Sequence, residues 1–322
     1  MPPIPARWLR TTSYDSLPAM SASLDRFVAI HAALVAGRTP LDRDTWLRAG
    51  ALAALDAPGD PTAVAQHVRL AANHLFTGAA WFSPLASQLR YLAAGVLAAT
   101  QGEPASFIAE VEALRRNLAT AGLPHQGRHE VLAALVLRAT GAAPSASLTA
   151  MSQLWRGMKR QHRWLTGADD LPACALLASS GAPAATLLTR MDAAWDALHE
   201  RGARRGNLLQ ATSHLLALAG DDARLLAGRC TLLARRCRGR GIPGWDERAY
   251  PAIALLATSS DDPAVLADRL ARAVEQVWTA TRCIYDLTTL HTAALLLARE
   301  LPNAESRRLL AAAVVFAAGP RH

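Results

Sequence analysis

Two adjacent acids, Asp169 and Asp170, stand in the stretch HRWLTGADDLPACALLAS at residues 162–179. A histidine and a tryptophan precede them, and a continuous apolar run follows. Two neighbouring carboxylates in a partly enclosed site push one of their pKa values upward. A carboxyl group with a pKa near neutrality can both donate and accept a proton. We therefore take Asp169 and Asp170 as candidate catalytic residues for acid/base chemistry.

A second group of polar residues lies on the next apolar segment. Asn207, Gln210 and His214 occur at i, i+3 and i+7, a spacing that places them on one face of a helix. His214 lies two turns inside that helix, which is too deep to serve its terminus. It is either a core histidine with satisfied hydrogen bonds or a pocket residue, and both interpretations stay open. In the second interpretation His214 joins the two acids as a catalytic candidate, while Asn207 and Gln210 orient a ligand.

The segments that lead into the other apolar helices carry further charged residues. When these segments are superimposed, several side chains fall at or beside the places of Asp169 and Asp170, and two arginines precede Asn207. The candidate ligand-binding residues found in this way are Arg90, His129, Glu130, Arg204, Arg205 and Arg248. Because the helices they precede run parallel, we expect these residues at one rim, as a pocket for a small polar or anionic molecule.

Helix capping is the competing explanation for part of this set. Ser83-Pro84 is typical of an N-cap followed by proline, and Asn207 with Gln210 has the spacing of a capping box. Thr166 with Asp169 resembles such a box as well. Capping alone could account for Ser83, Thr166, Asn207 and Asp246. It does not account for His214, or for the second of two adjacent acids.

A repeat of about 40 residues organises the chain. Matching leucines in six apolar segments recur at steps of 39 to 41 residues, at Leu97, Leu137, Leu177, Leu216, Leu256 and Leu297. A break rich in Gly, Pro, Ser or Asp follows each segment, and an amphipathic helix follows most breaks. We therefore expect an all-α fold of about seven αα-hairpin repeats, forming an α/α toroid or a curved solenoid. Residues 1–20 are expected as an irregular N-terminal arm and 21–322 as a single αα-repeat domain.

Composition restricts the classes of protein. With 51% hydrophobic and 19% charged residues, the chain has ample material for a core and is not expected to be disordered. The net charge of +8 comes from scattered arginines that alternate with acids, which is typical of solvated helix faces rather than of a DNA-binding stripe. Four cysteines without a CxxC motif, and the absence of a leader-like or membrane-spanning apolar run, favour a cytoplasmic protein without a membrane partner.

Motifs for established chemistry are missing from the sequence. There is no HExxH, GxSxG, P-loop or strand-associated nucleotide fingerprint, and Gly167 stands where a DxDD motif requires its first aspartate. His129, Asp169, Asp170 and His214 could hold a metal only if the rim closes tightly, so no metal site is assigned. The cofactor is unknown.

Three segments resemble a bacterial helical family known only as a domain of unknown function. They are WFSPLASQLRYLAAGVL (81–97), GMKRQHRWLTGADDLPACALLA (157–178) and RRGNLLQATSHLLAL (204–218), and the similarity extends over about residues 22–300. The resemblance implies that His162, Thr166 and Ser213 belong to the family pattern, together with the two acids and the Asn207 group. His162 thereby joins the ligand-binding candidates. The resemblance implies no reaction, cofactor or partner.

Three functions are compatible with these observations. The first is a pocketed helical repeat that binds a small polar or anionic ligand at the rim, and whether it is also an enzyme stays open. The second is a scaffold that holds a peptide or protein on an open concave surface without a deep cavity. The third, ranked below both, is a DNA-backbone binder whose arginines line one concave face.

Overall fold

The computed structural model describes residues 22–318 except 126, 221, 241, 243–246, 282–286 and 302–305. These described residues form fifteen α-helices and three short 3₁₀ turns, without a strand. The predicted all-α class is therefore confirmed. The N-terminal arm expected at 1–20 and the proposed cap Asp246 lie outside the described residues.

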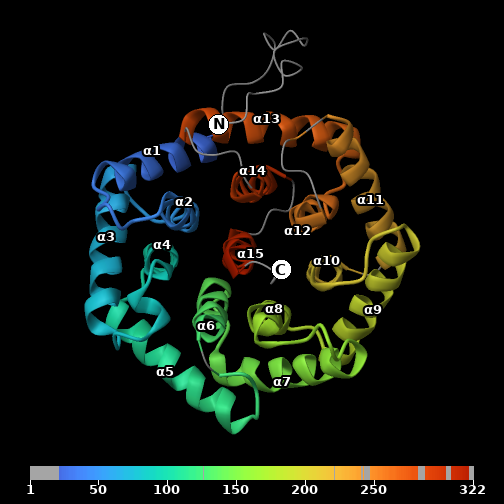
Figure 1. Cartoon of the computed structure of the whole chain (residues 1–322), viewed down its shortest axis with the longest axis horizontal. Coiled ribbons are helices and arrows are strands. Elements are labelled where there is room, and N and C mark those ends of the chain that lie inside the picture. Colours follow the sequence, from blue (N-terminus) through green and yellow to red (C-terminus); the bar gives the residue numbers. More distant parts are fainter. Residues whose placement is uncertain are drawn as a thin grey trace.

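Helices alternate along the chain between an outer and an inner ring (Figure 1). The outer helices are α1 (Ala22–Ala36), α3 (Pro61–Gly78), α5 (Pro104–Thr120), α7 (Pro144–Gln161), α9 (Ala184–Glu200), α11 (Ala223–Gly239) and α13 (Pro263–Thr281). The inner helices are α2 (Asp44–Ala53), α4 (Leu89–Thr100), α6 (Arg128–Thr140), α8 (Leu171–Ala178), α10 (Asn207–Ala219), α12 (Tyr250–Ala257) and α14 (Leu287–Arg299). The 3₁₀ turns η2 (Pro84–Ala86), η3 (Ala168–Asp170) and η4 (Glu247–Ala249) precede α4, α8 and α12.

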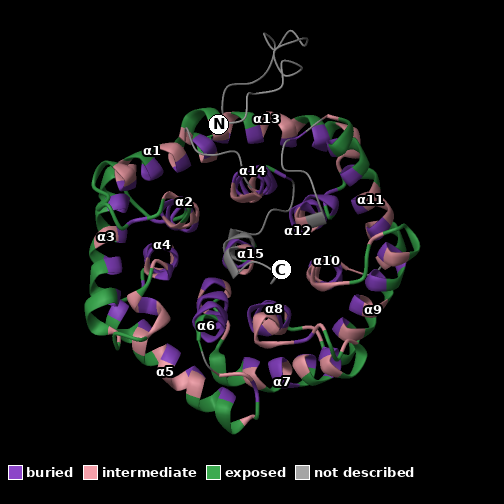
Figure 2. Ribbon diagram, viewed as in Figure 1, coloured by how far each residue is buried: buried purple, intermediate pink, exposed green. Residues whose placement is uncertain are grey.

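Side-chain polarity explains which helices are inner and which are outer. The sequences LPACALLA of α8 and YPAIALLA of α12 are apolar all round, and neighbours cover them on most sides. The outer helices are amphipathic, and Figure 2 shows their buried residues turned toward the inner ring and their exposed residues turned outward. Proline stands in the first turn of α3, α5 and α7, where its missing N–H costs no helical hydrogen bond.

The ring of helices closes on itself. The last outer helix, α13, packs beside α1, and α14 packs beside both α1 and α2 (Figure 1). A fifteenth helix, α15 (Ser306–Ala318), occupies the centre. It lies off-centre, because its extensive contacts are with α6, α14, α8 and α2. Space is therefore left on the side of α10 and α12.

The described inner helices begin at one face of the ring. The backbone N–H of Arg43, before α2, donates to Oε1 of Gln88, before α4, over 3.1 Å. The starts of α8, α10 and α14 and the turn before α12 line a common cavity. We call this the entry face; it carries the connections at 37–43, 79–88, 121–127, 162–170, 201–206 and 240–249. The exit face carries the return connections at 54–60, 101–103, 141–143, 179–183, 220–222, 258–262 and 300–305.

Candidate functional site

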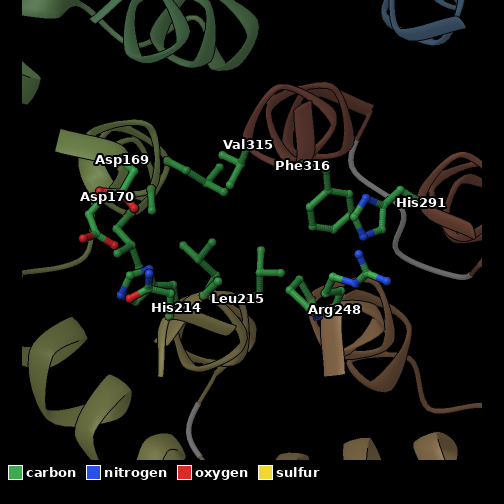
Figure 3. A pocket seen from close by; sticks show the side chains of 15 residues that line it. Asp169, Asp170, His214, Leu215, Arg248, His291, Val315 and Phe316 are labelled. Carbon is green, nitrogen blue, oxygen red and sulfur yellow. The ribbon is translucent and has the colours of Figure 1, made fainter. Parts of the chain in front are cut away.

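A cavity lies between α15 and the inner helices α8, α10, α12 and α14, where the off-centre α15 leaves space (Figure 3). It holds about 750 Å³ of empty space, part of which is open to solvent. Its lining consists of Asp169, Asp170, Ala173, Leu176, Leu177, Asn207, Ala211, His214, Leu215, Leu218, Arg248, Pro251, His291, Val315 and Phe316. Five of these were candidates from the sequence, namely Asp169, Asp170, Asn207, His214 and Arg248. The fold thus brings together residues from three consecutive repeats.

Asp170 is the most strongly perturbed acid of the cavity. Its Oδ2 accepts the backbone N–H of Gly167 over 2.9 Å, and its Oδ1 accepts Nε2 of Gln210 over 3.0 Å. Burial raises the pKa of Asp170 to about 7, the Gly167 hydrogen bond opposes the rise, and the neighbouring charge of Asp169 adds to it. The expected effect of the second carboxylate is present, but loss of water is the larger cause.

His214 is a neutral side chain within the same cavity. It is 3% exposed, and its Nε2 has no hydrogen-bond partner among the described residues. Burial, with a smaller contribution from His162, lowers the pKa of His214 to about 3. At neutral pH the imidazole therefore carries no charge and can donate one hydrogen bond and accept another. Its role is to orient a bound group, because a base with so low a pKa holds a proton poorly.

The other end of the cavity is basic and aromatic. Figure 3 shows Arg248, His291 and Phe316 on the side opposite Asp169 and Asp170, with Leu215 and Val315 between the two ends. The rings of His291 and Phe316 are in contact, with centroids 4.8 Å apart at an angle of 30°. The cavity therefore has an acidic end, an apolar middle and a basic end.

The capping predictions are only partly confirmed. Oγ of Ser83 accepts the N–H of Leu85 over 3.3 Å, as an N-cap should. The prediction was wrong for Thr166, whose hydroxyl donates to the carbonyl of His162 over 3.1 Å, back along its own chain. It was also wrong for Asn207, which is the first residue of α10 after an N-cap at Gly206 and lines the cavity instead.

Gln210, Arg90 and His162 lie outside the cavity lining. Gln210 is buried behind Asp170 and reaches the cavity only through that acid. Arg90 bonds the buried Asp42 over 3.1 Å. His162 stacks on Trp195 with ring centroids 4.2 Å apart, so it joins α7 to α9.

The four other predicted binding residues also lie elsewhere. His129 and Glu130 are buried in the first turn of α6, and burial raises the pKa of Glu130 to about 7. Arg204 and Arg205 are exposed on the connection before α10. Superposition of repeats placed these residues near Asp170 in register, but the cavity forms only where α15 leaves the inner ring uncovered.

Sequence analysis missed His291 and Phe316. His291 precedes its register leucine, Leu297, by six residues, as Gln210 precedes Leu216. That equivalence could have identified His291. Phe316 has no such signal, because α15 stands outside the repeat. In the described part of the chain, His, Cys, Asp and Glu residues do not form a group of three that could hold a metal ion.

Comparison with known families supplies one match. A family model described as "Protein of unknown function (DUF4003)" matches residues 72–297. The chain belongs to this family. The resemblance seen in the sequence is thereby confirmed, although the match begins later than the expected residue 22. No curated protein and no solved structure matches the chain.

The DUF4003 match contains most of the cavity. Every lining residue from Asp169 to His291 falls within 72–297, whereas Val315 and Phe316 lie beyond it. The family description names no activity, so the chemistry of this DUF4003 protein must be inferred from the cavity itself. Among the described residues, no helix is long and apolar enough to cross a membrane.

Proposed function

We propose that the cavity binds a small molecule with a cationic or hydrogen-bond-donating group at one end and an anionic group at the other. The observation that carries this proposal is the placement of Asp169 and Asp170 opposite Arg248 within one cavity. A carboxylate pair favours a cation, and a guanidinium favours a carboxylate or phosphate. The apolar middle, with Leu215 and Val315, fits a hydrocarbon segment between the two charged groups.

The acidic end also supports acid/base chemistry. With its pKa near 7, Asp170 is present in both protonation states at neutral pH, so it can take a proton from a bound group or return one. His214 lines the same end and, being neutral, offers a hydrogen bond without competing for the cation. In this proposal Asp170 exchanges the proton, Asp169 holds the cationic group, and His214 and Asn207 orient it.

The shape of the site favours a small ligand over a peptide. A peptide-binding scaffold would need a long open groove, whereas here the ring closes and α15 fills its centre. A DNA-binding concave face would need arginines from several repeats, yet Arg248 is the one arginine of the described cavity lining. Both alternatives therefore rank below a small zwitterionic or anionic molecule.

We further propose that the ring is an α/α toroid of seven repeated hairpins. The leucine register at steps of 39 to 41 residues and the alternation of inner and outer helices support this description. In a toroid each repeat contributes the start of one inner helix to the same face. This arrangement would explain how residues 40 or 80 positions apart come to share one site.

A thermal-shift screen tests the ligand proposal. The panel contains amino acids, α,ω-diamines and dicarboxylates of increasing length, and a molecule that binds only the folded state raises the unfolding midpoint. We expect the largest shift from a molecule with both charges, and its loss in Asp170→Asn. Asp196→Asn, an exposed acid on α9, is the matched control and should respond like the wild type. Failure of every panel member, or an equal response of Asp170→Asn, would refute the proposal.

A cavity-filling variant provides an independent check. Ala211 lines the cavity, so Ala211→Trp places an indole in the space that the ligand would occupy. We expect this variant to fold and to lose the ligand-induced shift while keeping both charged ends. A ligand that still stabilises Ala211→Trp binds elsewhere.

A further inference from the structure

The two faces of the ring carry opposite exposed charges. In the described parts of the entry-face connections, all exposed charged residues are arginines: Arg38, Arg43, Arg163, Arg201, Arg204 and Arg205. In the described parts of the exit-face connections, all are acids: Asp56, Asp60, Glu103, Asp222, Asp262 and Glu300. The net charge of +8 is therefore not spread evenly, as the sequence suggested, but is separated along the axis of the ring.

Capping explains the acidic face but not the basic one. Asp60 and Asp222 accept backbone N–H groups at the starts of α3 and α11, so acids are expected where outer helices begin. The entry face is where inner helices begin, and there the same principle would favour acids as well. Exposed arginines in those connections therefore need another explanation.

Large apolar side chains accompany the arginines on the entry face. Trp164 is 93% exposed and Trp81 is 88% exposed, on the connections before α8 and α4. Phe82 and Leu41 are also exposed, at 72% and 81%, on the connections before α4 and α2. The Arg43–Gln88 and Arg90–Asp42 hydrogen bonds hold those two connections side by side, so Leu41, Trp81 and Phe82 belong to one region.

We propose that the entry face binds the surface of a membrane rich in anionic phospholipid. Arginines attract the anionic headgroups, while tryptophan and its apolar neighbours enter the interface between headgroups and acyl chains. Nucleic acid would use the arginines, but its backbone offers nothing to an exposed leucine, and stacking on tryptophan requires unpaired bases. This peripheral contact replaces the expectation of no membrane partner, which rested only on the lack of a spanning segment.

Sedimentation with lipid vesicles tests the proposal on the full chain. Vesicles of equimolar phosphatidylglycerol and phosphatidylcholine are compared with pure phosphatidylcholine, at low and at high salt. We expect binding to the anionic vesicles only, weakened by salt, because exposed charges are screened. Absence of binding to anionic vesicles, or equal binding to both compositions, would overturn the proposal.

Matched variants place the contact on the correct face. The double variant Trp81→Ser/Trp164→Ser should lose most vesicle binding, whereas Leu225→Ser/Val265→Ser, at exposed apolar positions beside the exit face, should keep it. Arg205→Glu should weaken binding by at least about fivefold, and Arg224→Glu, the same charge change beside the exit face, should not.

Two outcomes contradict the assignment even if vesicles bind. Equal losses in the entry-face and exit-face variants would show that the contact is not confined to the entry face. Binding of a single-stranded oligonucleotide in place of vesicles, with the same dependence on Trp81 and Trp164, would assign the face to nucleic acid. All four variants change exposed side chains, and their unfolding midpoints are measured alongside.

Discussion

Gln210 in α10 donates a hydrogen bond of 3.0 Å from Nε2 to Oδ1 of Asp170, which lies 40 residues earlier at the start of α8. Because Gly167 occupies the other oxygen of the carboxylate, both oxygens of this acid are held within the protein. Oε1 of Gln210 has no partner among the described residues. One hydrogen bond thus joins neighbouring repeats and fixes the orientation of the acid whose pKa lies near neutrality.

Replacing Asp170 by asparagine should change how stability depends on pH. A carboxyl group of an unfolded chain ionises near pH 4, whereas the pKa of Asp170 in the folded protein is about 7. Between these values the unfolded state releases a proton that the folded state keeps, so the free energy of unfolding falls as pH rises. Asp170→Asn lacks this loss, so its stability relative to wild type should rise by up to about 4 kcal/mol from pH 4 to pH 8.

Urea unfolding at pH 4, 6 and 8 measures this difference. The asparagine keeps the geometry, since its Oδ1 can accept the Gly167 N–H and its Nδ2 can donate to a flipped Gln210 amide. Glu130, whose pKa is also about 7, is present in both proteins, so its contribution cancels. The exposed Asp196→Asn serves as the control. A difference that stays constant across the pH range would show that Asp170 is not perturbed.

Arg248→Gln should weaken binding of the ligand identified by the screen. Loss of a charge-assisted hydrogen bond costs about 1.5–3 kcal/mol, which corresponds to roughly a tenfold to hundredfold rise in Kd. Arg204→Gln removes an arginine that precedes α10 in the same way but is exposed outside the cavity, so Kd should stay within about twofold. Isothermal titration calorimetry provides both values. Equal effects of the two substitutions would mean that the anionic group does not lie at the basic end.

Most of the fold could be predicted from the sequence because each hairpin is specified locally. The leucine register, the Gly- and Pro-rich breaks and the two kinds of helix together set the alternation of inner and outer helices. Closure could not be predicted, since it depends on small rotations accumulated over all repeats. The central helix α15 could not be placed either, because nothing in its sequence marks it as the element that fills the ring.

The candidate site could be predicted only where local spacing decides it. Asp169, Asp170, Asn207 and His214 were found because their positions do not fit a purely apolar inner helix. Arg90 and Glu130 occupy equivalent register positions but lie outside the cavity, at Asp42 and in α6 respectively. Equivalent register does not give an equivalent environment, because α15 covers one side of the inner ring and not the other.

Asp44→Ala should destabilise the protein at the place where the ring closes. The Asp44 carboxylate lies 2.9 Å from Nε of Arg48 and 2.9 Å from Nε2 of His31, and Arg48 also donates to Oγ1 of Thr289 in α14. Arg48 is 3% exposed, so removing its carboxylate leaves a buried charge without compensation. Such a loss costs about 3–5 kcal/mol.

A second ion pair across the same junction supplies the control. Asp56 pairs with Arg299, the last residue of α14, but this pair is nearer to solvent. Asp56→Ala should therefore lower the free energy of unfolding by at most about 1 kcal/mol. Chemical denaturation compares the two variants. If Asp44→Ala costs no more than Asp56→Ala, the His31–Asp44–Arg48 cluster contributes little to closure.

Gly95→Ala should disrupt the contact between α2 and α4, where the two backbones approach closely. A Cβ on Gly95 would lie 2.4 Å from the carbonyl oxygen of Gly50 and 2.9 Å from Cβ of Ala53, and backbone atoms cannot move aside cheaply. Overpacking of this kind costs about 1–3 kcal/mol. Gly239→Ala, at the end of α11 with nothing within 4 Å of its Cβ, should instead be neutral or stabilising by up to about 1 kcal/mol. Thermal unfolding of both variants decides: similar midpoints would mean that α2 and α4 can separate without loss, and that their close approach does not hold the ring together.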